Sequence, residues 1–249
     1  MTTSDMVVDV SQDWLLACSV QERFMREPAL GNCQVDYSAS CRQLRALGGD
    51  CYDFSCQADG QLAMLVGDAS GKGLAAALMM ASVQASLRTA AVFSGHNLAS
   101  LMGVVNAQAC ASSLADRFAT LFYAVLNQAE RTLRYVNAGH NPPVVLHRDG
   151  SIDWLEPSGA PVGLFSDATW QEQVIRLQPG DRVVAYTDGV TEVCSPSGEE
   201  WGIEGLLQAA DDRGLNSAPE LVRSIFHAMD DFSGSVQADD ATVAAMCVL

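Results

Sequence analysis

The order of predicted strands and helices along the chain constrains its fold most. Alternating or β-rich segments open the first half, at 33–40, 50–57 and 61–68. Two consecutive helices follow, at about 71–93 and 97–114. Strands then resume at 118–127, 132–139, 143–148, 151–156, 170–178 and 181–188. Two more helices, at about 202–212 and 218–232, precede a last strand at 241–248. Hairpin strands in blocks, separated by helix pairs, predict an α+β fold with antiparallel sheet packed against segregated helices.

The first 32 residues differ from this pattern. Between residues 10 and 27, apolar side chains such as Trp14 and Phe24 recur at roughly helical spacing, and Pro28 ends the run. No repeat and no Pro/Gly/Ser-rich linker divides the rest of the chain. We therefore expect an N-terminal helix or linker over 1–32 and one domain over 33–249.

Charge and cysteine usage exclude several classes of protein. The chain has 14 Lys+Arg against 30 Asp+Glu, a formal net charge of -16, which repels nucleic acid and anionic lipid. Its eight cysteines form no CxxC pair, which favours free thiols in a reducing compartment. The N-terminus lacks a signal-peptide pattern, and the apolar run 74–81 is short of the ~20 residues that span a bilayer. These features predict a cytoplasmic protein that binds neither nucleic acid nor membrane.

The stretch GDASGKG, residues 67–73, suggests a loop that wraps a phosphate. A P-loop requires four residues between its first two glycines and a Ser or Thr after the lysine. Here three residues separate Gly67 from Gly71, and Gly73 follows Lys72. The spacing therefore disfavours a nucleotide-binding loop and leaves Asp68, at the end of an apolar strand, as the notable residue.

Aspartates occur at four predicted strand ends. They are Asp50 after Gly48-Gly49, Asp68, Asp188 before Gly189, and the pair Asp239-Asp240. Two carboxylates ~5 Å apart repel by roughly 3 kcal/mol at an effective dielectric of 20, and hard divalent cations relieve that repulsion. The adjacent glycines permit close backbone approach. If the strand ends converge, this pattern favours Mg²⁺ or Mn²⁺; taken singly, each aspartate is equally typical of a turn or a helix cap.

Six ordered blocks resemble the metal-dependent protein phosphatases of the PPM, or type 2C, family. The blocks are LGGDCYDF (47–54), GDASGKGLAAALMMA (67–81), YVNAGHNPPVV (135–145), YTDGVTE (186–192), GEEWG (198–202) and ADDATV (238–243). The chain is most similar to the bacterial SpoIIE-type branch. The resemblance implies two packed antiparallel sheets flanked by helix pairs, an αββα sandwich.

The resemblance also implies a site and a reaction. Two Mn²⁺ or Mg²⁺ ions would be held by Asp50, Asp68, the Ala69 carbonyl, Asp188 and Asp239. Asp240 is the alternative to Asp239, since neighbouring strand residues face opposite sides. Asp68 and Asp188 are the residues expected to act in catalysis. A water activated by the metals would attack phosphoserine or phosphothreonine in a protein, with no side-chain nucleophile.

Four further residues near the motifs have open roles. His140 is expected to be structural or, less readily, a proton donor to the leaving serine. Lys72 either contacts phosphate or is a solvated lysine at a helix start. Asp53 and Glu192 are expected at most to orient the motif residues.

The resemblance also suggests partners. The expected substrate is a phosphorylated regulatory protein, similar to an anti-anti-sigma factor. A sensor or receiver domain and a homodimer are both compatible with the sequence. The helix at 10–27 either packs on its own domain or ends a linker from such a regulatory domain. The alternative function is a catalytically weak partner-switching domain that binds a phosphoprotein without turning it over.

Overall fold

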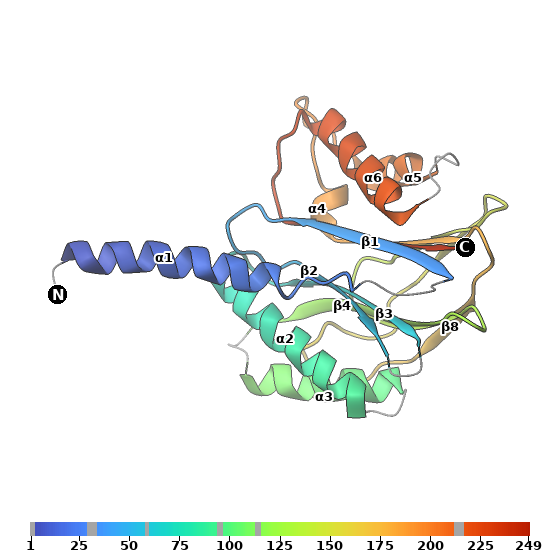
Figure 1. The fold of residues 1–249 in the computed structure, drawn as a ribbon, viewed down its shortest axis with the longest axis horizontal. Coiled ribbons are helices and arrows are strands. Elements are labelled where there is room, and N and C mark those ends of the chain that lie inside the picture. The colour runs from blue at the N-terminus through green and yellow to red at the C-terminus, as the bar shows by residue number, and fades with distance from the viewer. Residues whose placement is uncertain (1–2, 29–33, 58–59, 94–96, 113–115, 212–216) are drawn as a thin grey trace.

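Two five-stranded sheets pack face to face and helices cover both outer faces (Figure 1). The computed structural model describes residues 3–28, 34–57, 60–93, 97–112, 116–211 and 217–249, with side chains from residue 12 onward. The predicted αββα sandwich is therefore confirmed. The first residue of the predicted strand 33–40 and the expected boundary between residues 32 and 33 lie outside the described residues, so that domain boundary stays a prediction.

The first sheet, here called the β10 sheet, has the order β1-β10-β9-β6-β7. Its strands are β1 (Val35–Arg42), β10 (Ala241–Val248), β9 (Arg182–Tyr186), β6 (Val144–Leu146) and β7 (Ile152–Trp154). All of its strand pairs are antiparallel. The last strand of the sequence thus lies between the first strand and β9, and it is buried along its whole length.

The second sheet, here called the β3 sheet, has the order β2-β3-β4-β5-β8. Its strands are β2 (Cys51–Cys56), β3 (Leu62–Ala69), β4 (Ala119–Asn127), β5 (Thr132–Ala138) and β8 (Gln173–Arg176). The pairs are again antiparallel. Alternate residues of β3 and β4 pack in the apolar cluster under α2 and α3 and in the cluster between the sheets, so both faces of these strands are covered. This explains why their sequences are continuously apolar rather than alternating.

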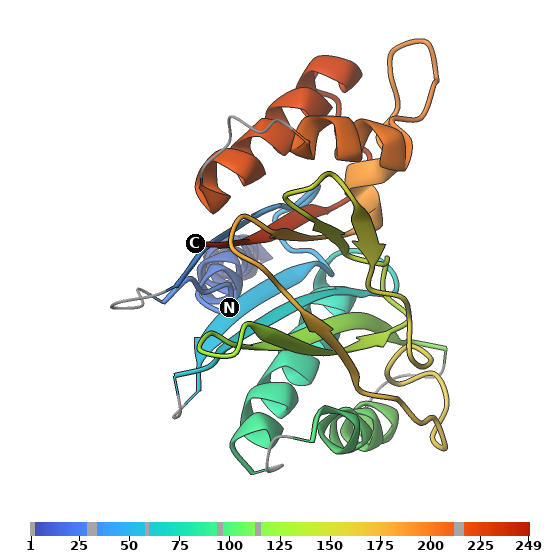
Figure 2. The ribbon, with the colours of Figure 1, turned by 90° about the vertical axis from the view of Figure 1, so that its right-hand side faces the viewer.

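Each helix pair covers one sheet (Figure 2). α2 (Leu74–Phe93) and α3 (Leu98–Ser112) pack on the β3 sheet, and α5 (Gly202–Ala210) and α6 (Ala218–Ser233) pack on the β10 sheet. Ser217 caps α6 by accepting a hydrogen bond from the Glu220 N–H, and Gly234 ends that helix in the left-handed conformation. A third apolar cluster, which includes Phe54, Phe122 and Leu133, fills the space between the sheets.

α2 is long and apolar enough, by length and composition alone, to cross a membrane. The run 74–81 on which the sequence estimate rested is only its first part. The helix lays Met80, Val83 and Leu87 into the core against the β3 sheet, and core helices of soluble proteins pass the same test. This property is therefore weak evidence for a membrane segment, and the cytoplasmic location stays a prediction.

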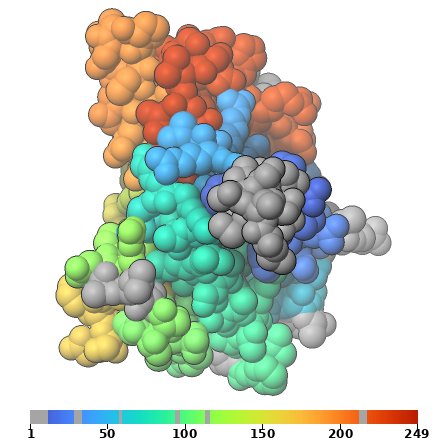
Figure 3. Space-filling model, turned by 90° about the vertical axis from the view of Figure 1, so that its left-hand side faces the viewer, coloured from blue at the N-terminus to red at the C-terminus, as the bar shows by residue number. Residues whose placement is uncertain are grey.

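The N-terminal helix α1 (Thr3–Glu22) begins and ends earlier than expected from the pattern over 10–27. It projects from the sandwich (Figure 1), on the side of the molecule that Figure 3 views, and Leu15 and Leu16 of α1 are exposed. The residues that follow it are fixed to the body: Arg88 and Gln84 of α2 both donate hydrogen bonds to the Phe24 carbonyl. The chain leaving α1 is thus attached to α2, whereas the α1 side chains at residues 12–16 are exposed.

The Phe122 side chain should contribute strongly to stability, because it is fully buried between the sheets and contacts Tyr135 at a ring distance of 5.7 Å. We expect Phe122→Ala to lower the free energy of unfolding by about 3–5 kcal/mol in chemical denaturation. Phe93→Ala is the matched control, because Phe93 is 82% exposed, and we expect a change below about 0.5 kcal/mol. Equal losses in both variants would contradict this assignment of the core.

Candidate metal centre

The predicted strand-end aspartates converge at one edge of the sandwich. Asp50 immediately precedes β2 and Asp68 lies near the end of β3; these strands pair with Cys51 opposite Gly67. In the β10 sheet, Val243 pairs with Tyr186, and the Thr187 N–H donates to the Thr242 carbonyl. The entrance to β10 and the end of β9 therefore lie side by side. The β3 sheet contributes Asp50 and Asp68, and the segments next to β9 and β10 contribute Asp188, Asp239 and Asp240.

Asp188 does not end a strand, contrary to the sequence expectation. β9 stops at Tyr186, and Asp188 is the first residue of a short helix, α4 (Asp188–Thr191). A carboxylate in a first helical turn is compatible with the helix dipole. Burial, and then the charge of Asp239, raise the pKa of Asp188. The charge of Asp188 in turn raises the pKa of Glu192.

Asp50 is held between the two sheets. Its side chain is 1% exposed, and one carboxylate oxygen accepts hydrogen bonds from the hydroxyls of Thr187 and Thr242, both at 2.7 Å. Burial and the charge of Asp68 raise the pKa of Asp50, while the two threonine hydrogen bonds act in the opposite direction. The threonines therefore fix the orientation of this carboxylate and partly offset the cost of burying it.

Glycines allow the strand ends to approach closely. A Cβ atom at Gly49 would stand 2.7 Å from the Ala69 carbonyl oxygen, and one at Gly189 would stand 1.9 Å from the Asp240 carbonyl oxygen. The Ala69 N–H also donates to the Gly49 carbonyl at 3.2 Å. Larger residues at either glycine would force the ends apart, so the expectation that these glycines permit tight backbone is confirmed.

Asp68 lies among the other carboxylates. Burial, followed by the charges of Asp188 and Asp239, raises the pKa of Asp68 to about 7. Both causes disfavour the charged form of the Asp68 carboxyl group, and a bound cation would favour it. The neighbouring Ala69 is fully buried, so its backbone is held firmly in β3.

Asp239 and Asp240 have different surroundings. Asp240 is 8% exposed, and its carboxylate accepts hydrogen bonds from the backbone N–H groups of Leu44 (2.7 Å) and Gly49 (2.9 Å). Asp239 instead forms an ion pair with Lys72 at 2.6 Å, and its second oxygen accepts from the Asp240 N–H. Asp240 thus stabilises the loop before Asp50. Asp239 lies at the partly exposed side of the carboxylate cluster, where it pairs with Lys72.

His140 and Asp53 have structural surroundings. His140 is 2% exposed, its Nδ1 lies 2.9 Å from the Thr120 hydroxyl, and burial lowers its pKa to about 4. The burial of His140 and its contact with Thr120 favour the structural interpretation over a role as proton donor. Asp53 forms an ion pair with Arg88 of α2 at 2.6 Å. It anchors that helix and does not orient the carboxylates, contrary to the sequence expectation.

Three residues at the site were missed by sequence reasoning. Thr187 and Thr242 lie inside quoted blocks, next to Asp188 and after Asp240, so their positions could have drawn attention to them. No sequence feature indicates that Gln21 of α1 lies near the site. Its side-chain amide donates to the Gly48 carbonyl at 2.7 Å and accepts from the Gly48 N–H at 3.3 Å. That double hydrogen bond connects the N-terminal helix to the loop carrying Asp50.

The carboxylates are chemically suited to divalent cations, although their side chains are not already arranged as a metal-binding group. Within the described residues, no three His, Cys, Asp or Glu side chains already form a metal-binding group. The described carboxylates have other partners in this structure, such as the threonine hydroxyls at Asp50 and the lysine at Asp239. All-oxygen donors at a partly buried edge suit Mg²⁺ or Mn²⁺.

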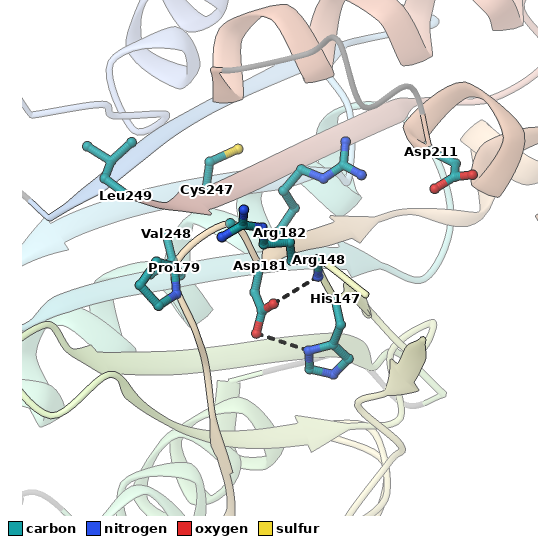
Figure 4. A pocket seen from close by; sticks show the side chains of 10 residues that line it. His147, Arg148, Pro179, Asp181, Arg182, Asp211, Cys247, Val248 and Leu249 are labelled. Carbon is teal, nitrogen blue, oxygen red and sulfur yellow. Dashed lines mark hydrogen bonds and ion pairs between the residues drawn. The ribbon is translucent and has the colours of Figure 1, made fainter. Parts of the chain in front are cut away.

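A separate cavity of about 560 Å³ lies at the opposite end of β9 and β10 (Figure 4). Its lining includes Arg148 and Arg182, but also Asp181 and Asp211, so its charges largely cancel. Asp181 accepts hydrogen bonds from the Arg148 and Gln178 N–H groups and contacts His147. These contacts connect the β6–β7 hairpin to β9, and the cavity has no evident relation to the carboxylates.

Comparison with known proteins agrees with this description. The profile of the family described as Stage II sporulation protein E (SpoIIE) matches residues 58–249. The chain is 28% identical to protein IcfG of Synechocystis, over 91% of this chain and 40% of IcfG. It is 26% identical to the phosphoserine phosphatase RsbU of Bacillus subtilis, over 94% of this chain and 70% of RsbU. The phosphoserine phosphatase RsbP of the same organism is 25% identical, over 71% of this chain and 44% of RsbP.

Solved structures show the same fold. The SiaA-PP2C domain of Pseudomonas aeruginosa superposes with a TM-score of 0.82 at 18% identity, over 98% of each chain. The RsbU and RsbW domains of Rv1364c from Mycobacterium tuberculosis give 0.72 at 25% identity, over 86% of this chain and 59% of that one. Related folds include RsbX in complex with magnesium (TM-score 0.65, 16% identity, 89% and 98% covered) and PstP in complex with two manganese ions (0.63, 17%, 86% and 98%).

The different surroundings of the two neighbouring aspartates predict different effects on stability. Asp240→Asn should lower the free energy of unfolding by about 1–3 kcal/mol in the presence of EDTA, because an amide cannot accept both backbone hydrogen bonds. Asp239→Asn should change it by less than about 1 kcal/mol, because it loses only an exposed ion pair and relieves repulsion. Chemical denaturation measures both. The reverse order of the two effects would show that the roles are exchanged.

Proposed function

We propose that this chain, which belongs to the SpoIIE family, is a metal-dependent phosphatase of phosphoserine or phosphothreonine in a protein. One observation carries the proposal: the aspartates of both sheets converge on one edge, where Asp50 is fixed by threonines of the opposite sheet. The names of RsbU and RsbP, both phosphoserine phosphatases, support the same activity.

The proposed ligands are Asp50, Asp68, the Ala69 carbonyl, Asp188 and Asp239. Two divalent cations, when bound, supply Lewis acidity and a water of lowered pKa for in-line attack on phosphorus. The ions named in the RsbX and PstP structures support Mg²⁺ or Mn²⁺ at this type of site. We favour Asp239 over Asp240 as the ligand, because two backbone N–H groups already occupy the Asp240 carboxylate.

The residues of this chain have distinct tasks in that reaction. Thr187 and Thr242 orient Asp50, and Asp240 holds the loop 44–49 against the entrance of β10. Asp68 and Asp188 lie close enough for the charge of Asp188 to raise the pKa of Asp68. No side-chain nucleophile is needed, since attack by water completes the hydrolysis in one step.

For the substrate we propose a phosphorylated regulatory protein, similar to an anti-anti-sigma factor. The support is indirect: RsbU, RsbP and a structure with RsbU and RsbW domains are among the relatives. The chain spans 40% of the length of IcfG and 44% of the length of RsbP. A sensor or receiver domain as partner, a homodimer, and the absence of nucleic-acid binding remain parts of the proposal.

The decisive test is release of phosphate from a phosphoserine peptide with and without Mn²⁺. We expect activity that EDTA abolishes and that Asp68→Ala lowers by about 100-fold or more, an effect typical of losing a group that stabilises transition-state charge. Asp149→Ala is the control, because Asp149 lies in the turn between β6 and β7 and should not affect the rate.

Two results would contradict the proposal. Activity that survives EDTA or Asp68→Ala would exclude the metal mechanism. Tight binding of a phosphorylated regulator without phosphate release in Mn²⁺ would instead identify a binding domain of the partner-switching kind.

A further inference from the structure

We propose that Lys72 is a built-in counter-ion of Asp239 and competes with a divalent cation for that carboxylate. The inference rests on the proposed function, because it concerns the same site. It gives a role to the lysine of GDASGKG. The spacing of that stretch disfavours a nucleotide-binding loop, and the lysine is not a proposed metal ligand.

Lys72 has an unusual place in this chain, because it is the only lysine among 249 residues. Its Nζ donates a hydrogen bond to Asp239 Oδ2 at 2.6 Å and lies 3.5 Å from the Ala238 carbonyl. The ammonium thereby connects the loop after β3 to the segment that enters β10. A cation held by Asp239 would therefore have to share this carboxylate with the ammonium of Lys72.

The loop geometry holds the lysine at this position. Gly71 and Gly73 on either side adopt left-handed conformations, with φ of +95° and +74°, and α2 begins at Leu74. These turns fold the backbone tightly after Asp68. The lysine therefore cannot move far from the carboxylates, although its side chain can rotate.

The ion pair of Lys72 with Asp239, at 2.6 Å, brings a positive charge to the cluster of carboxylates. A cluster of carboxylates without bound cations needs such compensation. Once a divalent cation neutralises Asp239, the ammonium loses its attraction and is repelled by the ion.

Exposure makes the exchange feasible. The side chains of Lys72 and Asp239 are 45% and 37% exposed, and an ion pair of this kind contributes little to stability. A divalent cation can therefore displace the lysine at modest cost. A buried pair would block the metal instead.

Titration calorimetry with Mn²⁺ tests the competition directly. We expect Lys72→Met to tighten the weaker Mn²⁺ site by about three- to ten-fold, as follows from loss of one exposed pair and one repulsive charge. The gain should shrink as salt is raised. Lys72→Arg, which retains the charge, should stay within about two-fold of the parent protein.

Arg45→Met is the matched control for a general charge effect. An Arg45 guanidinium nitrogen lies 3.6 Å from the position of a Cβ atom at Gly73, so its charge is near the same loop, but it is not the partner of Asp239. We expect Arg45→Met to change Mn²⁺ affinity by less than about two-fold. Equal tightening in Arg45→Met and Lys72→Met would overturn the specific pairing, as would unchanged or weaker Mn²⁺ binding in Lys72→Met.

The single lysine permits an independent readout. Reductive methylation with ¹³C-formaldehyde retains its charge and labels only Lys72 and the N-terminal amine for NMR. We expect the Lys72 signal to move on titration with Mg²⁺ toward its position in Asp239→Asn. A signal that is the same in the parent protein and in Asp239→Asn, without metal, would show that the pair does not form.

These two measurements separate failure of the inference from failure of the proposed function. Absence of Mn²⁺ binding in both the parent protein and Lys72→Met would contradict the metal site, and with it the competition. Binding of equal strength in both proteins would leave the metal site intact and overturn the role of Lys72 alone.

Discussion

The two hydroxyl groups that reach Asp50 from the opposite sheet are the interaction on which the site depends. Asp50 belongs to the β3 sheet, whereas Thr187 and Thr242 belong to the β10 sheet. A buried carboxylate is costly unless it is hydrogen-bonded, so this contact favours only one relative position of the sheet ends. The same position brings Asp68 of one sheet near Asp188 and Asp239 of the other.

The apolar core and the carboxylate edge make opposite demands on the fold. Clusters between the sheets and under both helix pairs supply the favourable burial, with Phe54 and Phe122 fully enclosed. The edge costs free energy, because several carboxylates are held close without matching charge. Backbone N–H groups at Asp240, hydroxyls at Asp50 and one ammonium at Asp239 each offset part of that cost. Apolar burial in the core thus offsets the unfavourable electrostatic free energy of the carboxylate edge, as is common at functional sites.

Much of the fold could be predicted from the sequence, because strongly periodic segments reveal their secondary structure. The strand and helix order, the hairpin of β2 and β3, and the two helix pairs are all present. The predictions from sequence were wrong where tertiary contacts override the local sequence pattern. Asp188 starts a helix because β9 has already ended at Tyr186, and α1 extends beyond its apolar pattern into a projecting segment. Asp53 turns to Arg88 of α2, a partner 35 positions away that no local pattern indicates.

The sequence by itself determined which residues could carry the chemistry, because aspartates beside glycines at strand ends are visible without any structure. It also excluded a nucleotide loop through the spacing of Gly67 and Gly71. Only the tertiary structure decided how neighbours divide their tasks: Asp240 accepts from the backbone of a loop almost 200 positions away, while Asp239 faces Lys72. The physical reason is that hydrogen bonds and charge interactions depend on distance in space. For residues remote in the chain, strand pairing within each sheet and the packing of the two sheets set that distance.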